Sequence, residues 1–413
     1  MTDLDVMKPY RILALDGGPS PVTYLRALYK LEQHSLVHHN VSLLNQVDMF
    51  AGTSGGSVAA LYLASTAPPK DGRKDDPCSK QLTSLERIRN CIDLIDAFYT
   101  KFFKPPLGNI VGSALGLRSL VDVHPLVEIM NRYFPDNAER TLGSLPVDVC
   151  LMSYQVRTPM HVRILHNFDV PSLPTEADPL LQNLLDTQTV QSAFSDSKKQ
   201  RSYTVRDTIL RSSGFPLFMP VHNGCIDGGF FANNPSFCAL TTYLFSDYLR
   251  GHVEKPFESL NKLSLLSFGG QSQQFASGIA KRKLNNNSVS WGWPFWIINP
   301  RFPLLLFETI IDANVQGSQQ STEQILGNRS FRLAYTGGTH GLASTLIDNF
   351  FSSPSAIREK ARDAVESWRH PSRYESYPYF THSWFHTMFW LENFWFPQSP
   401  EAITTPDKQG SAS

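Results

Sequence analysis

The sequence predicts an α/β fold with three layers, α/β/α, around a central and mostly parallel sheet, and with a helical C-terminal region. Two strand, turn and helix units near the N-terminus carry this prediction. In the first, the apolar run 10–15 ends at the turn 16–18, and apolar residues then recur at helical spacing from Val22. In the second, the apolar run 47–51 meets the glycine-rich turn 52–56, and a helix-favouring stretch follows. Because a helix follows each strand, the strands are expected to lie parallel in one sheet.

Further along the chain, short apolar runs predict three more strands. They cover residues 148–154, 161–166 and 263–268. Beyond Gly270, helical patterns dominate the sequence. Two polar stretches, 65–90 and 171–201, are expected to form exposed segments that could border an active site, because function concentrates on loops.

Composition limits the function classes. The 413 residues include 37 basic and 37 acidic side chains, so the formal net charge of zero gives no sign of nucleic-acid binding. Five cysteines without a CxxC pair, and an N-terminus without an apolar secretory stretch, predict a cytoplasmic protein with reduced thiols. Since no run approaches the roughly 18 apolar residues of a membrane-spanning helix, any membrane contact is expected to be transient and peripheral.

The turn 52–56 has the G-x-S-x-G pattern of a nucleophile elbow, with Ser54 at its centre. Glycines on both sides of the serine remove steric conflict at the sharp passage from strand to helix. The N–H groups and the dipole at the start of the following helix favour the negative charge of an oxyanion. We therefore predict that Ser54 is a nucleophile that still needs a base.

Two residues compete for the role of this base. A Ser-His-Asp triad on an α/β-hydrolase fold places its histidine last in the chain, and His340 in the segment 337–341 is the candidate. Asp227 is the other candidate, because the tight turn Asp227-Gly228-Gly229 allows the backbone to aim a carboxylate. The residues by themselves leave both alternatives open.

Three motifs in this order resemble the patatin-like phospholipase family. They are Asp16-Gly17-Gly18, then Gly52-Thr53-Ser54-Gly55-Gly56, and then the serine-containing segment 211–220 that runs into Asp227-Gly-Gly-Phe-Phe-Ala-Asn-Asn-Pro235. The resemblance covers most of the chain. It implies a patatin-like catalytic domain over 10–240 and a mostly helical continuation of the same fold over 241–370. Residues 371–413 lie beyond the resemblance and are expected to form an aromatic-rich extension with a disordered tail.

The resemblance implies a Ser-Asp dyad without a histidine. Ser54 attacks an acyl ester of a lipid, Asp227 accepts its proton and returns it to the leaving group, and water hydrolyses the acyl-enzyme. No cofactor and no metal is expected. The motif glycines that accompany the dyad are Gly52, Gly56, Gly228 and Gly229. An aspartate with a pKa of about 3.9 is a weak base, so the site has to be desolvated.

The resemblance also implies an oxyanion hole formed by Gly17 and Gly18, with Gly55 contributing as in other G-x-S-x-G enzymes. Here the chain departs from the family pattern D-G-G-G-x-[RK]-G, because Pro19 replaces a glycine and Pro21 replaces the basic residue. Proline has no N–H to donate. The departure predicts a slow hydrolase or one with an unusual substrate. The alternative function is a catalytically weak or silent lipid-binding or regulatory protein on the same fold.

Two aromatic stretches, 291–296 and 377–396, are either core segments or contacts with a lipid surface, and core packing is the favoured interpretation. His382 and His386 are four residues apart, but the pattern lacks the glutamate of H-E-x-x-H, so we assign no metal to them.

Overall fold

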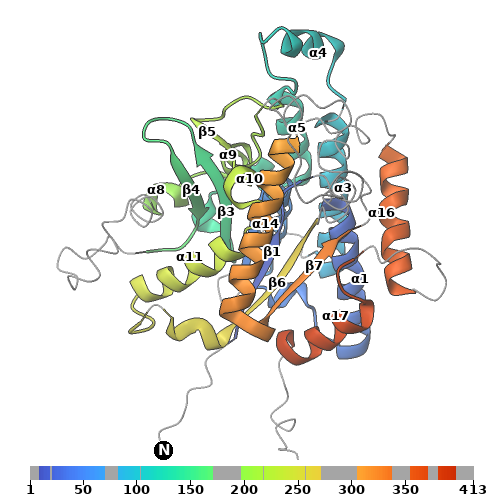
Figure 1. Ribbon diagram of the computed structural model, residues 1–413, viewed down its shortest axis with the longest axis vertical. Helices are drawn as coiled ribbons and strands as arrows, with labels where there is room; N and C mark the ends of the chain where they lie inside the picture. The colour runs from blue at the N-terminus through green and yellow to red at the C-terminus, as the bar shows by residue number, and fades with distance from the viewer. Residues whose placement is uncertain are drawn as a thin grey trace, which may run out of the picture.

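The computed structural model describes residues 9–18, 21–69, 82–102, 104–170, 197–216, 218–255, 257–270, 305–336, 354–370 and 380–396. Within these ranges seven strands form one sheet (Figure 1). They are β1 (Tyr10–Leu15), β2 (Met49–Thr53), β3 (Asp148–Gln155), β4 (His161–His166), β5 (Cys225–Asp227), β6 (Leu263–Gly270) and β7 (Ser330–Tyr335).

The strand order β4-β3-β2-β1-β6-β7 confirms the expected parallel sheet. Strands β3, β2, β1, β6 and β7 run parallel to their neighbours, while β4 and the short β5 pair with β3 in antiparallel fashion. Apolar side chains cover both faces, as in β1, where Leu13 and Leu15 belong to one core and Ile12 and Ala14 to the other. Burial on both faces explains why the strands are near-continuous apolar runs.

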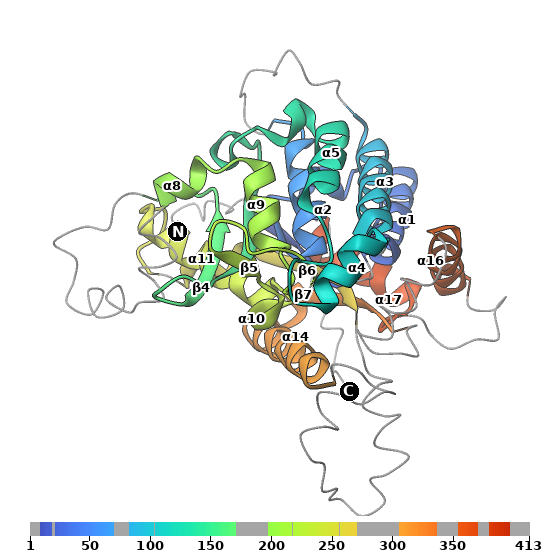
Figure 2. The same cartoon turned by 90° about the horizontal axis from the view of Figure 1, so that it is seen from above.

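Helices cover both faces of the sheet, so the predicted three layers are present (Figures 1 and 2). One side carries α1 (Pro21–His39), α2 (Gly55–Ser65), α3 (Ser84–Phe102), α5 (Val123–Tyr133), α9 (Val205–Ser212), α16 (Pro354–Arg369) and α17 (Trp384–Trp390). The other side carries α11 (Ser236–Leu249) and α14 (Leu305–Leu326). Shorter helices are α4 (Leu107–Ala114), α8 (Ser197–Arg201) and α10 (Gly229–Ala232), and 3₁₀ turns lie at Leu44–Gln46, Pro135–Ala138, Leu142–Ser144, Glu258–Lys262 and Gly327–Arg329.

Most of the expected strands lie where the sequence placed them. The second strand is displaced by two residues, to 49–53, so that it runs directly into Ser54. Strand β7 was missed, because Arg332 interrupts its apolar pattern within a region of helical character. The strands β6 and β7 extend the sheet beyond β1, so the C-terminal half of the chain contributes strands as well as helices.

The expected exposed segment 65–90 ends earlier than the sequence suggested. Helix α3 begins at Ser84, and its Arg87 is buried although it is charged. The guanidinium donates to Leu63 O at 2.7 Å and to Asn45 Oδ1 at 2.7 Å, and burial lowers the pKa of Arg87 to about 10. The arginine therefore stabilises the end of α2 from within, which its charge alone could not indicate.

The described part of the C-terminal aromatic segment, 380–396, packs mostly into the core, as the favoured interpretation expected, although Phe385 and Phe389 are exposed. Trp395, in the π-helical turn Leu391–Trp395, is fully buried, and its carbonyl accepts a hydrogen bond from Arg11 Nε at 2.6 Å. His382 and His386 pack against Phe331 with ring centroids 4.7 and 5.7 Å apart. The other aromatic stretch, 291–296, and the tail beyond 396 lie outside the described residues.

Across the described ranges, no helix combines the length and the apolar character needed to cross a membrane.

Candidate active site

Ser54 stands at a sharp turn between β2 and α2. Its backbone has φ 53° and ψ −124°, a conformation that residues with a side chain rarely adopt. The turn is tight because β2, α2 and β1 approach one another at glycines. A Cβ on Gly52 would collide with the carbonyl of Gly56, and a Cβ on Gly56 would collide with the carbonyl of Leu15. The turn therefore holds Ser54, which is half-buried, at the carboxyl end of the interior strand β2.

Strand β3 brings Ser54 and Asp227 together. Thr53, the last residue of β2, pairs with Met152, and Asp227 pairs with the next residue of β3, Ser153. Since β4 occupies the other edge of β3, the short strand β5 continues along the edge where β2 ends. The register of one strand thus places the candidate base beside the candidate nucleophile, although 173 positions in the sequence separate them.

Asp227 is fully buried, and its two carboxylate oxygens differ in their environment. Oδ1 accepts a hydrogen bond from Gly229 N–H at 2.7 Å, whereas Oδ2 is buried without a geometrically satisfactory partner among the described residues. Burial raises the pKa of Asp227 to about 6, and the nearby Ser54 hydroxyl and the Gly229 N–H oppose that rise. The backbone N–H of Asp227 donates to Gly214 O at 3.1 Å, which fixes the carboxylate to the serine-containing segment.

One expected oxyanion donor is not available. The N–H of Gly17 donates to Asn233 O at 3.0 Å, so it cannot also bind an oxyanion in this conformation. The neighbouring Gly18 has φ +106°, which glycine tolerates, and Gly55 is the first residue of α2, where leading N–H groups lack intrahelical acceptors. Pro19 lies outside the described residues, and Pro21 is buried at the start of α1.

The carbonyl groups of residues 16–18 are each held by a side chain from a different part of the fold. The hydroxyl of Tyr24, in α1, donates to Asp16 O at 3.0 Å. The amide of Asn233, just after α10, donates to Gly17 O at 3.4 Å. The hydroxyl of Tyr99, in the last turn of α3, donates to Gly18 O at 2.5 Å and also lies against the backbone of Gly55.

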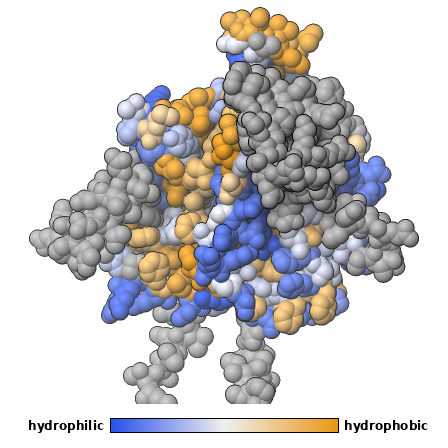
Figure 3. All heavy atoms as spheres, viewed as in Figure 1, coloured by the Kyte–Doolittle hydropathy of each residue, from blue (hydrophilic) through white to orange (hydrophobic). Residues whose placement is uncertain are grey.

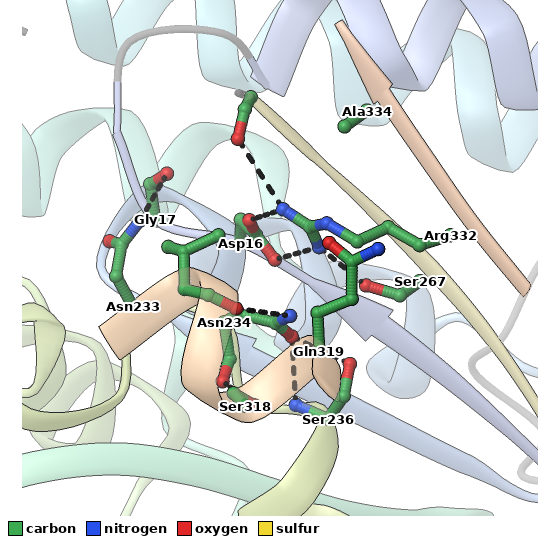
Figure 4. Close-up of polar contacts among 12 residues, drawn as sticks. Asp16, Gly17, Asn233, Asn234, Ser236, Ser267, Ser318, Gln319, Arg332 and Ala334 are labelled. Atoms are coloured by element: carbon green, nitrogen blue, oxygen red, sulfur yellow. Dashed lines mark hydrogen bonds and ion pairs between the residues drawn. The ribbon is translucent and has the colours of Figure 1, made fainter. Parts of the chain in front are cut away.

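Arg332 of β7 fixes the side chain of Asp16 (Figure 4). Its Nη1 and Nη2 donate to the two carboxylate oxygens at 3.1 and 2.5 Å, and Nη1 also donates to Ser267 Oγ at 2.8 Å. Both charged side chains are almost completely buried. Burial raises the pKa of Asp16, and Arg332 opposes that rise.

The segment Asn233-Asn234 links the loop to α14. The N–H of Asn233 donates to Asn314 Oδ1 at 3.1 Å, and the Asn314 amide donates to Gly229 O at 3.1 Å. Ser318 Oγ donates to Asn234 O at 2.9 Å (Figure 4). Helix α14 therefore positions both the turn after Asp227 and the loop at Gly17.

Sequence reasoning missed several residues that position this site. Tyr24, Tyr99 and Asn314 have ordinary helical contexts, so no local pattern marked them. Arg332 left a signal, because it is a lone charge in a strand that is otherwise apolar after Ser330. His340, the alternative base, lies outside the described residues.

Comparison with known proteins shows the family of the chain. Residues 13–237, more than half of the chain, match the family described as Patatin-like phospholipase. The chain is 24% identical over 351 residues to CotR of Bacillus subtilis (strain 168), covering 79% of this chain and 87% of CotR. It is also 24% identical over 348 residues to the protein teg of Priestia megaterium, covering 79% and 88% of the two chains.

Solved structures with some likeness include a chain of the SpcU–ExoU complex of Pseudomonas aeruginosa, with 13% identity and a TM-score of 0.26. That match covers 90% of this chain but only 65% of the other. VipD of Legionella pneumophila has 10% identity and a TM-score of 0.25, with 89% and 76% covered.

The fold and the sequence match define a hydrolase of the lipase or esterase type. The chain belongs to the patatin-like phospholipase family.

Proposed function

We propose that this protein hydrolyses carboxylic acyl esters of lipids, with Ser54 as the nucleophile and Asp227 as its base. The observation that carries the proposal is the fully buried Asp227 carboxylate, which has the Ser54 hydroxyl as a neighbour and whose only other partner among the described residues is the Gly229 N–H. A buried carboxylate with so few donors is costly to keep ionised, so this arrangement favours a role in proton transfer with Ser54.

In the proposed reaction the Ser54 hydroxyl oxygen attacks the ester carbonyl carbon while its proton passes to the Asp227 carboxylate. The tetrahedral intermediate collapses, the carbon–oxygen bond to the alcohol breaks, and Asp227 returns the proton to the departing alkoxide. Water then attacks the acyl group on Ser54 with Asp227 again accepting a proton. The acid leaves, and Ser54 regains its hydrogen.

The elevated pKa of about 6 supports the role of Asp227. A general base is most effective when its pKa lies near the working pH, and an unperturbed aspartate falls well short of that. At neutral pH a group with this pKa is still mostly ionised, so it can accept the proton. The single anchoring bond from Gly229 orients Oδ1 and leaves Oδ2 for Ser54.

For the oxyanion we propose the N–H groups of Gly55 and Gly18. The first is at the start of α2, where the helix dipole favours negative charge. The second belongs to a loop whose carbonyls are fixed by Tyr24, Asn233 and Tyr99, so its geometry is set before substrate binds. Because the Gly17 N–H is already bonded to Asn233 O and Pro19 has no N–H, we propose that few donors reach the oxyanion and that turnover is slow.

The proposed substrates are acyl-ester lipids, including neutral ones, because Pro21 stands where the family pattern has a basic residue. The name of CotR describes a sporulation hydrolase, which agrees with hydrolysis but specifies no lipid. We also propose that residues 10–240 and 241–370 form one catalytic unit, which the pairing of β6 with β1 supports. We also propose that the protein is located in the cytoplasm.

Hydrolysis of a soluble short-chain ester and of phosphatidylcholine tests the proposal. We expect Ser54→Ala to remove turnover and Asp227→Asn to reduce it by at least about 100-fold. Ser65→Ala is the matched control, because Ser65 ends the same helix and its hydroxyl has no partner among the described residues. Equal rates in all four proteins would exclude the dyad.

Two other outcomes would favour the alternatives. A folded wild type that binds lipid but hydrolyses neither ester would indicate a silent lipid-binding protein. Loss of turnover in His340→Ala, together with only a modest loss in Asp227→Asn, would indicate a histidine-dependent triad.

A further inference from the structure

Helix α4 exposes an apolar stripe to solvent. Leu107, Val111 and Leu115 are four residues apart and are 75%, 52% and 67% exposed. Leu117, in the turn that follows, is 78% exposed. Residues spaced by four lie on one face of a helix, so these side chains form one continuous surface. Contiguous apolar patches of this kind mark interaction sites in soluble proteins.

Hydrogen bonds within residues 107–118 hold this surface together. Arg118 Nη1 donates to Asn109 Oδ1 at 2.5 Å, and the N–H of Leu117 donates to Gly112 O at 2.9 Å. Figure 1 shows α4 standing clear of the three layers, and Figure 3 shows an apolar lobe at the same place. Arg118 packs against the face of α4 that contains Asn109 and Gly112, whereas the apolar stripe is exposed to solvent.

The charge around α4 indicates what kind of partner it fits. Residues 101–121 contain Lys101, Lys104 and Arg118 and no acidic residue. All three basic side chains are exposed. An apolar helix face with exposed basic residues before and after it in the chain is complementary to a membrane surface with anionic headgroups, because the apolar side chains enter the acyl region while lysine and arginine remain at the headgroups.

The chain segments directly before and after α4 form hydrogen bonds near the candidate active site. Before α4, the last turn of α3 carries Tyr99, which binds Gly18 O. After α4, the N–H of Val121 donates to Phe218 O at 2.7 Å. Phe218 lies 5.7 Å from Phe215, measured between ring centroids. These contacts place the apolar surface at the end of the molecule where Ser54 is located.

Aromatic rings continue from that anchor toward the base. Phe215 stacks on Phe230 with ring centroids 5.3 Å apart, and Phe230 follows Asp227-Gly228-Gly229 directly. A lipid acyl chain that leaves a membrane beneath α4 would thus meet apolar side chains up to the turn that holds Asp227. A partner protein could bind the exposed stripe without an apolar path from α4 to the turn at Asp227.

We propose that α4 and the turn after it, residues 107–118, dock this protein on lipid membranes that carry anionic headgroups. The proposal rests on the proposed function, since it gives the candidate active site access to lipid substrate. It assigns the docking surface to one helix and separates it from the C-terminal aromatic segment.

The molecule supplies a matched control for this surface. Phe385 and Phe389 on α17 are 78% and 54% exposed and also lie four residues apart. In Figure 1, α17 lies at the opposite end of the molecule from α4. An acidic residue, Glu392, follows Phe389 within one turn. If exposed apolar area alone determined membrane binding, this pair would bind as well as α4 does.

Sedimentation of the full chain with vesicles tests the proposal. The vesicles contain phosphatidylcholine alone or phosphatidylcholine mixed with phosphatidylserine. We expect the triple variant Leu107→Ser/Val111→Ser/Leu115→Ser to bind the mixed vesicles at least about tenfold more weakly than wild type. Phe385→Ser/Phe389→Ser is expected to bind like wild type. Lys101→Gln and Lys104→Gln should each weaken binding about fivefold, on the mixed vesicles only.

A soluble short-chain ester separates this proposal from the proposed function. The α4 variant should hydrolyse it at the wild-type rate, because the three substituted side chains are exposed to solvent and belong neither to the proposed dyad nor to the proposed oxyanion hole, while Ser54→Ala should not hydrolyse it. Membrane binding that survives the α4 substitutions, or that is lost equally in the α17 variant, would overturn the docking proposal and leave the hydrolase intact. A wild-type dimer that dissociates in the α4 variant would also overturn it, since the surface would then bind a second copy of the chain.

Discussion

Arg332 holds both carboxylate oxygens of Asp16, so the last strand of the sheet fixes the loop that follows the first. The two residues lie 316 positions apart and are almost fully buried. A buried ion pair offsets the cost of removing its charges from water only when its geometry is good, and here the arginine binds in a bidentate manner. The pair therefore sets the position of the loop at Gly17 and Gly18 relative to Ser54.

Removing the arginine should be costly, because Asp16 would be left as an unpaired buried charge. We predict that Arg332→Met lowers the free energy of unfolding by about 3–5 kcal/mol. Urea denaturation measures the change. Arg362→Met is the control, because Arg362 and its partner Glu359 are 61% and 67% exposed, and we expect a loss of at most about 1 kcal/mol. Similar losses in both variants would show that the Asp16 pair has no special structural role.

Activity should rise with pH as Asp227 ionises. Only the carboxylate form accepts a proton from Ser54, and burial holds its pKa near 6. We therefore predict that kcat/KM for a soluble ester increases about tenfold per pH unit below about pH 6 and levels off above it. A pH–rate profile measures this, and a profile that is already level at pH 5 would mean that Asp227 has its ordinary pKa or is not the base.

The same ionisation should lower stability. The folded-state pKa of Asp227 lies above the ordinary value of 3.8, so the folded protein binds the proton more tightly than the unfolded chain does. The stabilisation from this group is complete below about pH 4 and is lost as the pH rises through about 6, by up to about 3 kcal/mol. Asp227→Asn does not ionise, so we expect it to gain stability over wild type at neutral pH and little at pH 4. No difference between the two pH values would contradict the raised pKa.

The backbone of Ser54 should store strain. Its φ of 53° suits glycine better than a residue with a Cβ. We predict that Ser54→Gly is more stable than Ser54→Ala by about 1–2 kcal/mol. Both variants lack the hydroxyl, so the difference in their urea denaturation midpoints reports the backbone alone. If alanine were as stable as glycine at this position, the turn would not be strained.

Tyr99 should affect turnover more than Tyr24 does, although both hydroxyls donate to carbonyls of the same loop. Tyr99 binds Gly18 O and lies against Gly55, between the two proposed oxyanion donors, whereas Tyr24 binds Asp16 O. We predict that Tyr99→Phe lowers kcat by about 10- to 100-fold with little change in KM, and Tyr24→Phe by less than about threefold. Each should lose about 1 kcal/mol of stability. Equal effects on kcat would make Tyr99 a purely structural residue.

The sequence was sufficient where structure is local. Apolar runs followed by glycine turns located β1, β2 and the turn at Ser54. Each strand is buried on both faces, so its sequence is a continuous apolar run, and the backbone approaches at the turn leave room only for glycine. The order of the three motifs then gave the family and the central sheet. The pairing of Ser54 with Asp227 followed from resemblance, and the physical reason for it is the register of β3.

Contacts between residues that are far apart in the chain could not be predicted from the sequence. The hydrogen bond from Gly17 N–H to Asn233 O removes an expected oxyanion donor, and it depends on the contact between the loop after β1 and the end of α10. The raised pKa of Asp227 depends on burial, which no motif encodes. Arg87 has a charged side chain, yet it is buried because carbonyl and amide oxygens from other elements surround its guanidinium.

The most direct test of the central claim is the site of covalent labelling by a fluorophosphonate, read by mass spectrometry of proteolytic peptides. Attack on phosphorus requires an activated serine, so the adduct identifies the nucleophile and its rate of formation reports the base. We predict a single adduct on the peptide that contains Ser54, none in Ser54→Ala, and labelling at least about 100-fold slower in Asp227→Asn. An adduct on another residue, or labelling at the wild-type rate in Asp227→Asn, would contradict the Ser54–Asp227 dyad.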